Sequence, residues 1–526
     1  MDKIISLEEA ANLVKDGDTI WINSFSAIAS PVDLNKAMTK RFRETGTPKH
    51  LSVYSPFSFS DYEENSDVEG YICEGAVDRC VIGFFGSLVS TSKAIMNNEI
   101  EGYNLPGGVM SHMIRAAARG AEYLMTKTGI NLFVDPDYNG YKLNEKSKLD
   151  LVQKVKDIDG NTVLAYRIPK INIAFLKASV ADIHGNISFE TEAASIDALS
   201  VAQATHRNGG KVIVQVLHTI NRHMEPKNVQ IPSAFVDAIV VCPNQQQLTG
   251  LDGYYDYICG KYVPSGNILK AAAFEMMKKV KATSARNELH HAIAQRAYQE
   301  LRDDTIVNIG IGIPELICEE VLKNDRTESI HLSIESGHTG GMPLGGRAFG
   351  VAIGPDSMMD MARQFDFYEG GGLDMCFIGA LEVDKAGNVN GHYTKGKLSG
   401  IGGFANISQA TKKVCFCLTF NAKGLKGTFD GKKVTITQEG SIPKFVPAVA
   451  AKGFASQNAY ENAQDIMYIT ERCVFVLGPE GLVLTEIAPG IDLQTQILDL
   501  LDFDVKVADD LKLMDFGEQK SMTSLF

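Results

Sequence analysis

The sequence has no hydrophobic run long enough to cross a membrane and no Cys-x-x-Cys pair among its nine cysteines. Because a membrane-spanning helix needs about 20 apolar residues, the sequence predicts no such helix. The acidic, amphipathic segment 1–10 is unlike a signal or transit peptide. Cys415 and Cys417 alternate along an apolar run and are interpreted as buried structural residues. Together these features predict a protein of the reducing cytoplasm.

Metal-binding patterns and an excess of positive charge are also absent. His290 and His291 are neighbours on a segment with helical spacing, where adjacent side chains point about 100° apart and do not share a metal. No His-x-x-x-His pair with a further carboxylate occurs, so we predict no metal site. The net charge of −13 argues against a general affinity for nucleic acid or anionic membranes. It still permits an anionic ligand, because a local cluster of backbone N–H groups can bind phosphate.

Three matches in the same order along the chain indicate an internal duplication. Each joins a segment of the first half to one of the second, and the pairs are 16–23 with 303–310, 50–55 with 331–336, and 182–187 with 384–389. Short apolar runs alternate with helix-like segments in both halves, which predicts α/β domains with mostly parallel sheets. A length of 526 residues agrees with two large domains. The predicted domains are residues 1–275 and 285–526, joined by a linker at 276–284.

Glu335 is the first candidate for chemistry. It follows an apolar strand and precedes a glycine-rich turn, residues 336–341. Open α/β sheets bind ligands at the carboxyl ends of their strands, and glycines there let a substrate approach the backbone. Tyr54 stands at the matching position of the first copy. A carboxylate in one copy only suggests that one half supplies a nucleophile and the other shapes the pocket. The alternative is a solvated glutamate in a surface turn.

Two further glycine turns expose backbone N–H groups. Residues 308–315 read as a strand, a Gly-x-Gly turn and a proline at the first position of a helix, an arrangement suited to an oxyanion or a phosphate. A dinucleotide site is a weaker alternative, because Glu315 replaces the third glycine of that fingerprint and would repel a pyrophosphate. The second turn, residues 399–404, is equally rich in small residues, and its alternative is a flexible loop. Lys423 follows a later strand and either meets a phosphate or is solvated.

These segments resemble the motifs of class I coenzyme A transferases. The resemblance rests on residues 335–341, 310–314 and 400–403 and on the late stretches 469–473 and 486–491. It is closest to acetate and propionate CoA-transferases, which are fused single chains of about this length. It implies two duplicated three-layer α/β domains and a homodimer or homotetramer. It also implies coenzyme A as substrate and covalent intermediate, with no prosthetic group.

The resemblance implies a role for each candidate residue. Glu335 would attack the thioester of a short-chain acyl-CoA, such as acetyl-CoA or propionyl-CoA, and a glutamyl-CoA thioester would follow. The backbone N–H donors to the oxyanion would be Ile311 together with Gly402 or Gly403. The residues expected to contact coenzyme A are Gly310, Gly312, Gly400 and Lys423. The first half would then form the acyl pocket.

The first half departs from the family where that pocket is expected. Residues 24–31 contain no glycine after the first strand, and residues 54–59 are bulky and aromatic. These departures predict an acyl pocket of a different shape from that of an ordinary propionate enzyme. Residues 104–108, Asn-Leu-Pro-Gly-Gly, still resemble the family's loop before a helix.

Two other functions fit the same sequence. An acyl-CoA thioesterase would use the same glutamate with water as acceptor, and added acetate would then give no acetyl-CoA. A regulatory protein that binds coenzyme A or a sugar phosphate would need the glycine turns but not a carboxylate at position 335.

Overall fold

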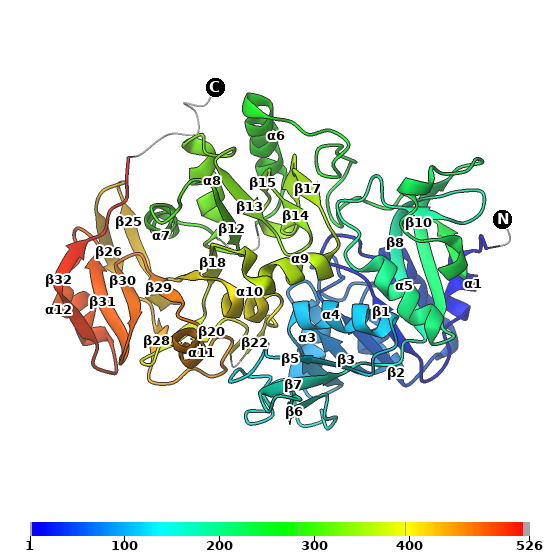
Figure 1. Ribbon diagram of the computed structural model, residues 1–526, viewed down its shortest axis with the longest axis horizontal. Coiled ribbons are helices and arrows are strands. Elements are labelled where there is room, and N and C mark those ends of the chain that lie inside the picture. Colours follow the sequence, from blue (N-terminus) through cyan, green and yellow to red (C-terminus); the bar gives the residue numbers. More distant parts are fainter. Residues whose placement is uncertain (1–2, 283–284, 395, 519–526) are drawn as a thin grey trace.

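The computed structural model describes residues 3–282, 285–394 and 396–518, which form two α/β halves side by side (Figure 1). In the first half, strands pair in the order β11-β10-β8-β1-β2-β3-β4, and all these neighbours are parallel. The strands of this order are β1 (Thr19–Ile22), β2 (Leu51–Ser55), β3 (Val77–Ile82), β4 (Glu101–Asn104), β8 (Ile173–Ala181), β10 (Lys211–Thr219) and β11 (Ala238–Val241).

The second half has a longer sheet with the order β17-β14-β13-β12-β18-β23-β29-β30-β31-β32. Its central strands β13, β12, β18, β23 and β29 are parallel neighbours, whereas β30 and β31 continue the sheet in antiparallel fashion. The strands are β12 (Thr305–Ile309), β13 (Ile330–Ser333), β14 (His338–Thr339), β17 (Ser357–Met358), β18 (Met375–Gly379), β23 (Lys413–Cys417), β29 (Asp465–Ile469), β30 (Cys473–Gly478), β31 (Gly481–Ile487) and β32 (Lys506–Leu513).

The two halves share one strand order, which confirms the predicted duplication and the mostly parallel α/β class. In each half the first strand lies between the second strand and one from much later in the chain, so that β2-β1-β8-β10-β11 corresponds to β13-β12-β18-β23-β29. The repeated Asp-x-x-Gly-Asn turns are also alike. The Asn186 N–H donates to the Asp182 carboxylate at 2.9 Å, and the Asn388 N–H donates to that of Asp384 at 3.0 Å.

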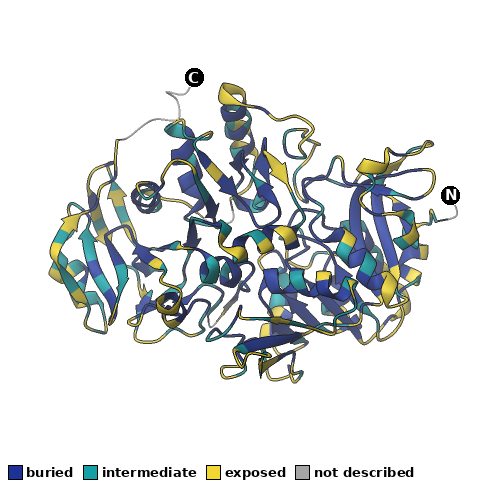
Figure 2. Cartoon of the chain, in the orientation of Figure 1, coloured by how far each residue is buried: buried dark blue, intermediate teal, exposed yellow. Residues whose placement is uncertain are grey.

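Helices cover both faces of the first sheet, as a three-layer domain requires. Trp21 and Ala174 pack in a core with α4 and α5, whereas Ile20 and Phe175 pack in another core with α1 and α2. Both parallel sheets are buried (Figure 2), because α/β crossovers cover their two faces. The helices are α1 (Leu7–Asn12), α2 (Val32–Thr45), α3 (Val89–Met96), α4 (Gly107–Ala118), α5 (Ala198–Arg207), α6 (Gly266–Lys279), α7 (Glu288–Tyr298), α8 (Glu315–Lys323), α9 (Met361–Phe367), α10 (Phe404–Ala410), α11 (Ser456–Glu461) and α12 (Leu493–Gln496).

The connection between the halves contains helix α6. The proposed linker 276–284 covers the end of this helix and the segment after it, although residues 283–284 lie outside the described residues. Ala273 of α6 packs in the core of the second half, and the Lys270 ammonium pairs with the Asp325 carboxylate at 2.6 Å. Helix α6 is therefore anchored on the second half, ahead of the linker.

Helices of the two halves meet in the middle of the molecule. Helix α4 of the first half packs against α9 and α10 of the second (Figure 1). This contact lies near Glu335, since α10 begins directly after Gly403, whose Cβ position is 3.4 Å from a Glu335 carboxylate oxygen. The seam between the halves therefore brings the Gly400–Gly403 turn close to Glu335.

Candidate active site

Glu335 lies two residues beyond the carboxyl end of β13, in a tight turn that leads to β14. The Gly337 N–H donates to the Ile334 carbonyl at 3.0 Å, and the Ile334 N–H donates to the His338 carbonyl at 2.9 Å. Gly337 has φ of 120°, and a Cβ there would lie 2.0 Å from the Met359 carbonyl oxygen. The glycine after Glu335 is therefore required by backbone conformation and by close packing.

The Glu335 side chain is buried, with 6% of its surface exposed, so it is not a solvated glutamate of a surface turn. The Asn308 amide, at the end of β12, donates to one carboxylate oxygen at 3.3 Å. Burial raises the pKa of Glu335 above its ordinary value of 4.5, and hydrogen bonds from its own backbone N–H and from Asn308 oppose that rise. A carboxylate with so few donors is poorly solvated, which favours nucleophilic attack.

Asn308 is a second polar residue at this site, and the sequence alone does not single it out. Its amide also donates to the Ser333 carbonyl at 3.2 Å, so it fastens β12 to the end of β13 beneath Glu335. The Ser333 hydroxyl in turn lies 2.8 Å from the Tyr368 hydroxyl. Burial and the nearby Glu335 charge raise the pKa of Tyr368, which keeps its proton on the phenol. The signal available in the sequence was a polar amide at the end of an otherwise apolar strand.

The Gly310–Gly312 turn follows β12, so it lies at the same sheet edge as Glu335. The Gly310 N–H donates to the Phe377 carbonyl at 2.8 Å, and the Gly312 N–H donates to the Glu315 carboxylate at 3.0 Å. The Ile311 N–H between them has no hydrogen-bond partner in the described part of the chain. Of the three N–H groups in this turn, that of Ile311 is therefore available to a ligand.

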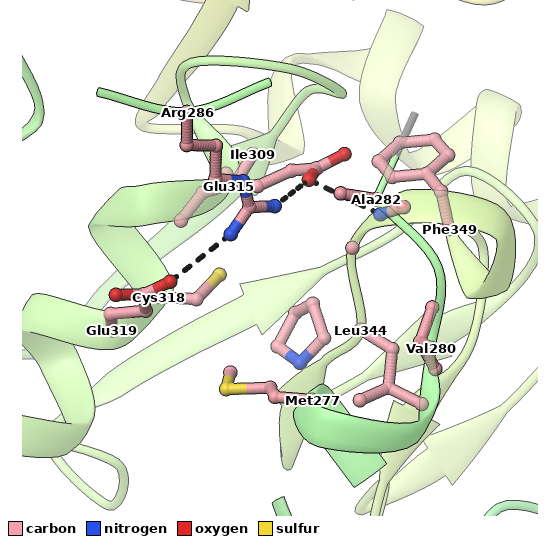
Figure 3. A pocket seen from close by; sticks show the side chains of 13 residues that line it. Met277, Val280, Ala282, Arg286, Ile309, Glu315, Cys318, Glu319, Leu344 and Phe349 are labelled. Atoms are coloured by element: carbon pink, nitrogen blue, oxygen red, sulfur yellow. Dashed lines mark hydrogen bonds and ion pairs between the residues drawn. The ribbon is translucent and has the colours of Figure 1, made fainter. Parts of the chain in front are cut away.

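Glu315 holds the first turn in place from the start of helix α8. Besides the Gly312 N–H, its carboxylate accepts the Gly346 N–H at 3.2 Å and pairs with Arg286 (Figure 3). Arg286 also pairs with Glu319 at 3.1 Å, beside a pocket of about 100 Å³. Glu315 therefore acts as a structural anchor, which agrees with its poor fit to a dinucleotide phosphate site.

The Gly400–Gly403 turn approaches Glu335 from the other side. A Cβ on Gly403 would lie 3.4 Å from a Glu335 carboxylate oxygen. The Gly402 N–H donates to the Gly83 carbonyl at 2.8 Å, and the Gly400 N–H donates to the His392 carbonyl at 3.2 Å. The Gly403 N–H has no hydrogen-bond partner among the described residues. This distinction separates Gly402 and Gly403, which the sequence left as alternatives.

Aromatic rings of the first half cover the second glycine turn. Phe57 packs against Phe25 with 4.1 Å between ring centroids, and the Phe84 centroid lies 6.5 Å from that of Phe57. A Cβ on Gly402 would lie 3.3 Å from the Phe57 ring. Tyr54, which matches Glu335 in the sequence, instead packs in the core against Trp21 at 6.1 Å. Phe57, three residues later, is the aromatic side chain of residues 54–59 that reaches the turn, and Phe84 lies beside it at 3.6 Å from the same Cβ position.

Lys423, the remaining predicted residue, is not among the described side chains that contact Glu335 or the two glycine turns. Lys423 is exposed and has φ of 57°, and its ammonium makes no hydrogen bond or ion pair with the described residues. His338 is fully buried, and burial lowers its pKa to about 4. The described residues contain no group of three or more His, Cys, Asp or Glu side chains arranged to hold a metal ion. Within the same residues, every helix is too short or too polar to span a bilayer.

Comparison with known proteins agrees with this geometry. A sequence model of the coenzyme A transferase family matches residues 4–242 and 290–491. The acetate CoA-transferase YdiF of Escherichia coli is 37% identical over 97% of this chain and 94% of its own. The caffeate CoA-transferase of Acetobacterium woodii is 35% identical over 98% of this chain and 97% of its own.

Solved structures extend the likeness to the fold. The crystal structure of YdiF from Escherichia coli O157:H7 as apoenzyme has a TM-score of 0.89 at 36% identity, covering 98% of this chain and 95% of that one. A crystal structure of the same acyl-CoA transferase as a thioester complex with coenzyme A has a TM-score of 0.88 at 35% identity, with the same coverage.

Proposed function

Because the chain belongs to the coenzyme A transferase family and is a CoA-transferase, we propose that Glu335 is its nucleophile and that a short-chain acyl-CoA is its substrate. The observation that carries this proposal is the buried Glu335 carboxylate beside the Gly403 backbone. The YdiF relative is named an acetate CoA-transferase, and this name favours acetyl-CoA or propionyl-CoA as the substrate here. The caffeate relative has an aromatic acid in its name, so the family likeness alone does not fix the acid.

The first half-reaction transfers coenzyme A to the enzyme. A Glu335 carboxylate oxygen attacks the thioester carbonyl of acyl-CoA, the C–S bond breaks, and an acyl-glutamyl anhydride and CoA thiolate result. The thiolate then attacks the glutamyl carbonyl, the anhydride C–O bond breaks, and a carboxylate leaves. Coenzyme A remains as a glutamyl-CoA thioester, whose activated carbonyl retains the energy of the original thioester.

The second half-reaction repeats these steps in reverse order with a different acid. The new carboxylate attacks the glutamyl thioester, which releases CoA thiolate and forms a mixed anhydride. The thiolate attacks the acyl carbonyl of that anhydride, so the new acyl-CoA leaves and Glu335 regains its carboxylate. Water must stay out because it would hydrolyse both intermediates. The burial of Glu335 and the aromatic cover over Gly402 support this exclusion.

Backbone N–H groups stabilise the oxyanions of these steps. We assign the donors to Ile311 and Gly403, because their N–H groups have no hydrogen-bond partner among the described residues. Each such donor contributes roughly 3 kcal/mol to the transition state. Residues 285–526 then carry the nucleophile, and residues 1–275 shape the acyl pocket through Phe57. Contacts with coenzyme A stay a prediction for Gly310, Gly312, Gly400 and Lys423. The contact with Lys423 requires coenzyme A to extend to an exposed side chain.

The proposal extends to assembly and location. A homodimer or homotetramer agrees with the resemblance to the family. A location in the cytoplasm agrees with the nine cysteines, which form no disulfide. Light scattering of the purified protein at several concentrations measures the assembly directly, and a monomer at all concentrations would contradict it.

The glutamate assignment is tested by substitution. Glu335→Gln keeps the size of the side chain and removes the nucleophile, so kcat for CoA transfer from acetyl-CoA to propionate falls by at least about three orders of magnitude. Glu69→Gln is the matched control, because Glu69 is also a buried glutamate whose pKa burial raises. The control keeps wild-type kcat within about threefold. Near-wild-type transfer by Glu335→Gln would reject the assignment, and hydrolysis without transfer in the wild type would favour the thioesterase.

A further inference from the structure

Asn104, the last residue of β4 in the first half, makes three side-chain hydrogen bonds at the seam between the halves. Its amide N–H groups donate to the carbonyls of Ile82 and Gly83, both at 2.7 Å. Its amide oxygen accepts the Ile401 N–H of the second half at 3.0 Å. The side chain is fully buried, so water does not replace these partners. Asn104 therefore connects a first-half loop to the second glycine turn.

The same loop fixes the next peptide groups of that turn. The Gly83 carbonyl, which accepts from Asn104, also accepts the Gly402 N–H at 2.8 Å. The Gly107 N–H, three residues after Asn104, donates to the Gly402 carbonyl at 2.7 Å. The Ile401 N–H, the Gly402 N–H and the Gly402 carbonyl are thus all hydrogen-bonded to residues of the first half.

This arrangement determines where the Gly403 N–H points. A trans peptide group is planar, so the Gly402 carbonyl and the Gly403 N–H point in opposite directions. Since the Gly402 carbonyl points at Gly107 of the first half, the Gly403 N–H points back into the second half. Glu335 lies on that side, with one carboxylate oxygen 3.4 Å from the Cβ position of Gly403.

We propose that Asn104 is a positioning residue for CoA transfer, through which the first half orients the Gly403 N–H toward the reacting carbonyl of Glu335 or its substrate. This inference rests on the proposed role of Glu335 and of the Gly403 N–H. Only an amide side chain of this length offers two donors and one acceptor at once, because aspartate lacks the donors and would set its charge against two carbonyls. The active site is then composite, with the nucleophile from one half and the orientation of its donor from the other.

The experiment measures how fast acetyl-CoA alone loads coenzyme A onto the intact enzyme, together with the steady-state kcat and KM. In Asn104→Ala and Asn104→Asp, a misplaced donor lowers the loading rate and kcat by about 100-fold. KM for acetyl-CoA changes by less than about threefold, because ground-state binding is untouched. Asn104→Ser retains one hydrogen bond and falls between wild type and Asn104→Ala, which gives a measurable series if the other variants fold poorly.

Asn458→Ala is the matched control. Asn458 is also a buried asparagine that bonds across the seam, to Ile130 and Asn131, but it makes no hydrogen bond to residues 400–403. Its removal lowers the melting temperature as Asn104→Ala does, and it leaves kcat within about threefold of wild type. Equal kcat losses in the two variants, or a loss confined to KM, would overturn the proposal. If wild-type Glu335 is never loaded, the proposed function itself fails; if the wild type and Asn104→Ala load equally fast, only the positioning role fails.

Discussion

At the scale of single residues, the proposed chemistry depends on a carboxylate that is buried away from water. Glu335 was identifiable from the sequence because it stands between an apolar strand and a glycine turn in one copy of the duplication only. Its hydrogen-bond partner Asn308 was not, because the contact depends on β12 and β13 lying side by side. The choice between Gly402 and Gly403 depended on Gly83, more than 300 residues earlier, which no local pattern predicts.

The pH dependence of loading follows from the same burial. Attack requires ionised Glu335, and burial raises its pKa above 4.5, so the loading rate falls as pH drops through this raised value. We expect the acid limb to begin above the pH at which an exposed glutamate would titrate. The measurement is the loading rate with acetyl-CoA from pH 4 to pH 8, roughly the range in which carboxylates and histidines titrate.

Buried histidines do not account for this limb, because burial lowers the pKa of His338 to about 4 and that of His392 to about 3. Melting temperatures recorded at each pH separate titration of the site from unfolding. A loading rate that stays constant down to pH 4.5 in the folded enzyme would contradict the raised pKa of Glu335.

At the scale of elements, a turn is useful only if its N–H groups are held in fixed positions. The Gly-x-Gly-x-Pro pattern predicted the strand, the turn and the helix start at residues 308–315, because glycine permits the turn and proline fits the first helical turn. The pattern did not reveal that Glu315 occupies the Gly312 N–H, since its other partners, Arg286 and Gly346, come from distant segments.

Removal of this anchor should loosen the first turn. In Glu315→Ala the Gly312 and Gly346 N–H groups lose their acceptor, so the Ile311 N–H is less well placed and kcat falls by about tenfold. Glu319→Ala is the control, because Glu319 pairs with the same Arg286 but accepts no N–H from the turn. Steady-state assays of both variants with acetyl-CoA and propionate make the comparison. An equal kcat in Glu315→Ala and wild type would show that the turn does not need its anchor.

At the scale of the whole molecule, duplication has given two similar sheets with different tasks. The repeated strand order and the repeated Asp-x-x-Gly-Asn turns followed from the sequence, because local patterns define each strand and turn. The aromatic cover over Gly402 did not, because Phe25, Phe57 and Phe84 come from separate segments. Aromatic residues 54–59 predicted an altered pocket, yet Phe57 rather than Tyr54 reaches the site.

Phe57 should limit the length of the acyl chain. Phe57→Ala removes a ring that lies 3.3 Å from the Cβ position of Gly402, so longer acyl groups gain space. We expect the ratio of kcat/KM for hexanoyl-CoA to that for acetyl-CoA to rise by at least about tenfold. Phe59→Ala is the control, because Phe59 is also buried but packs in the core with α1 and α2 and not in the core that contains Phe57. An unchanged ratio in Phe57→Ala would place the acyl pocket elsewhere.

The central claim is that coenzyme A becomes covalently attached to Glu335. The most direct measurement is the mass of the proteolytic peptide that contains Glu335, after incubation with acetyl-CoA and no acceptor acid. The account predicts a mass increase equal to coenzyme A minus one water on Glu335, which disappears when propionate is added before proteolysis. An unmodified Glu335 peptide, while the same enzyme turns over acetyl-CoA and propionate, would contradict it.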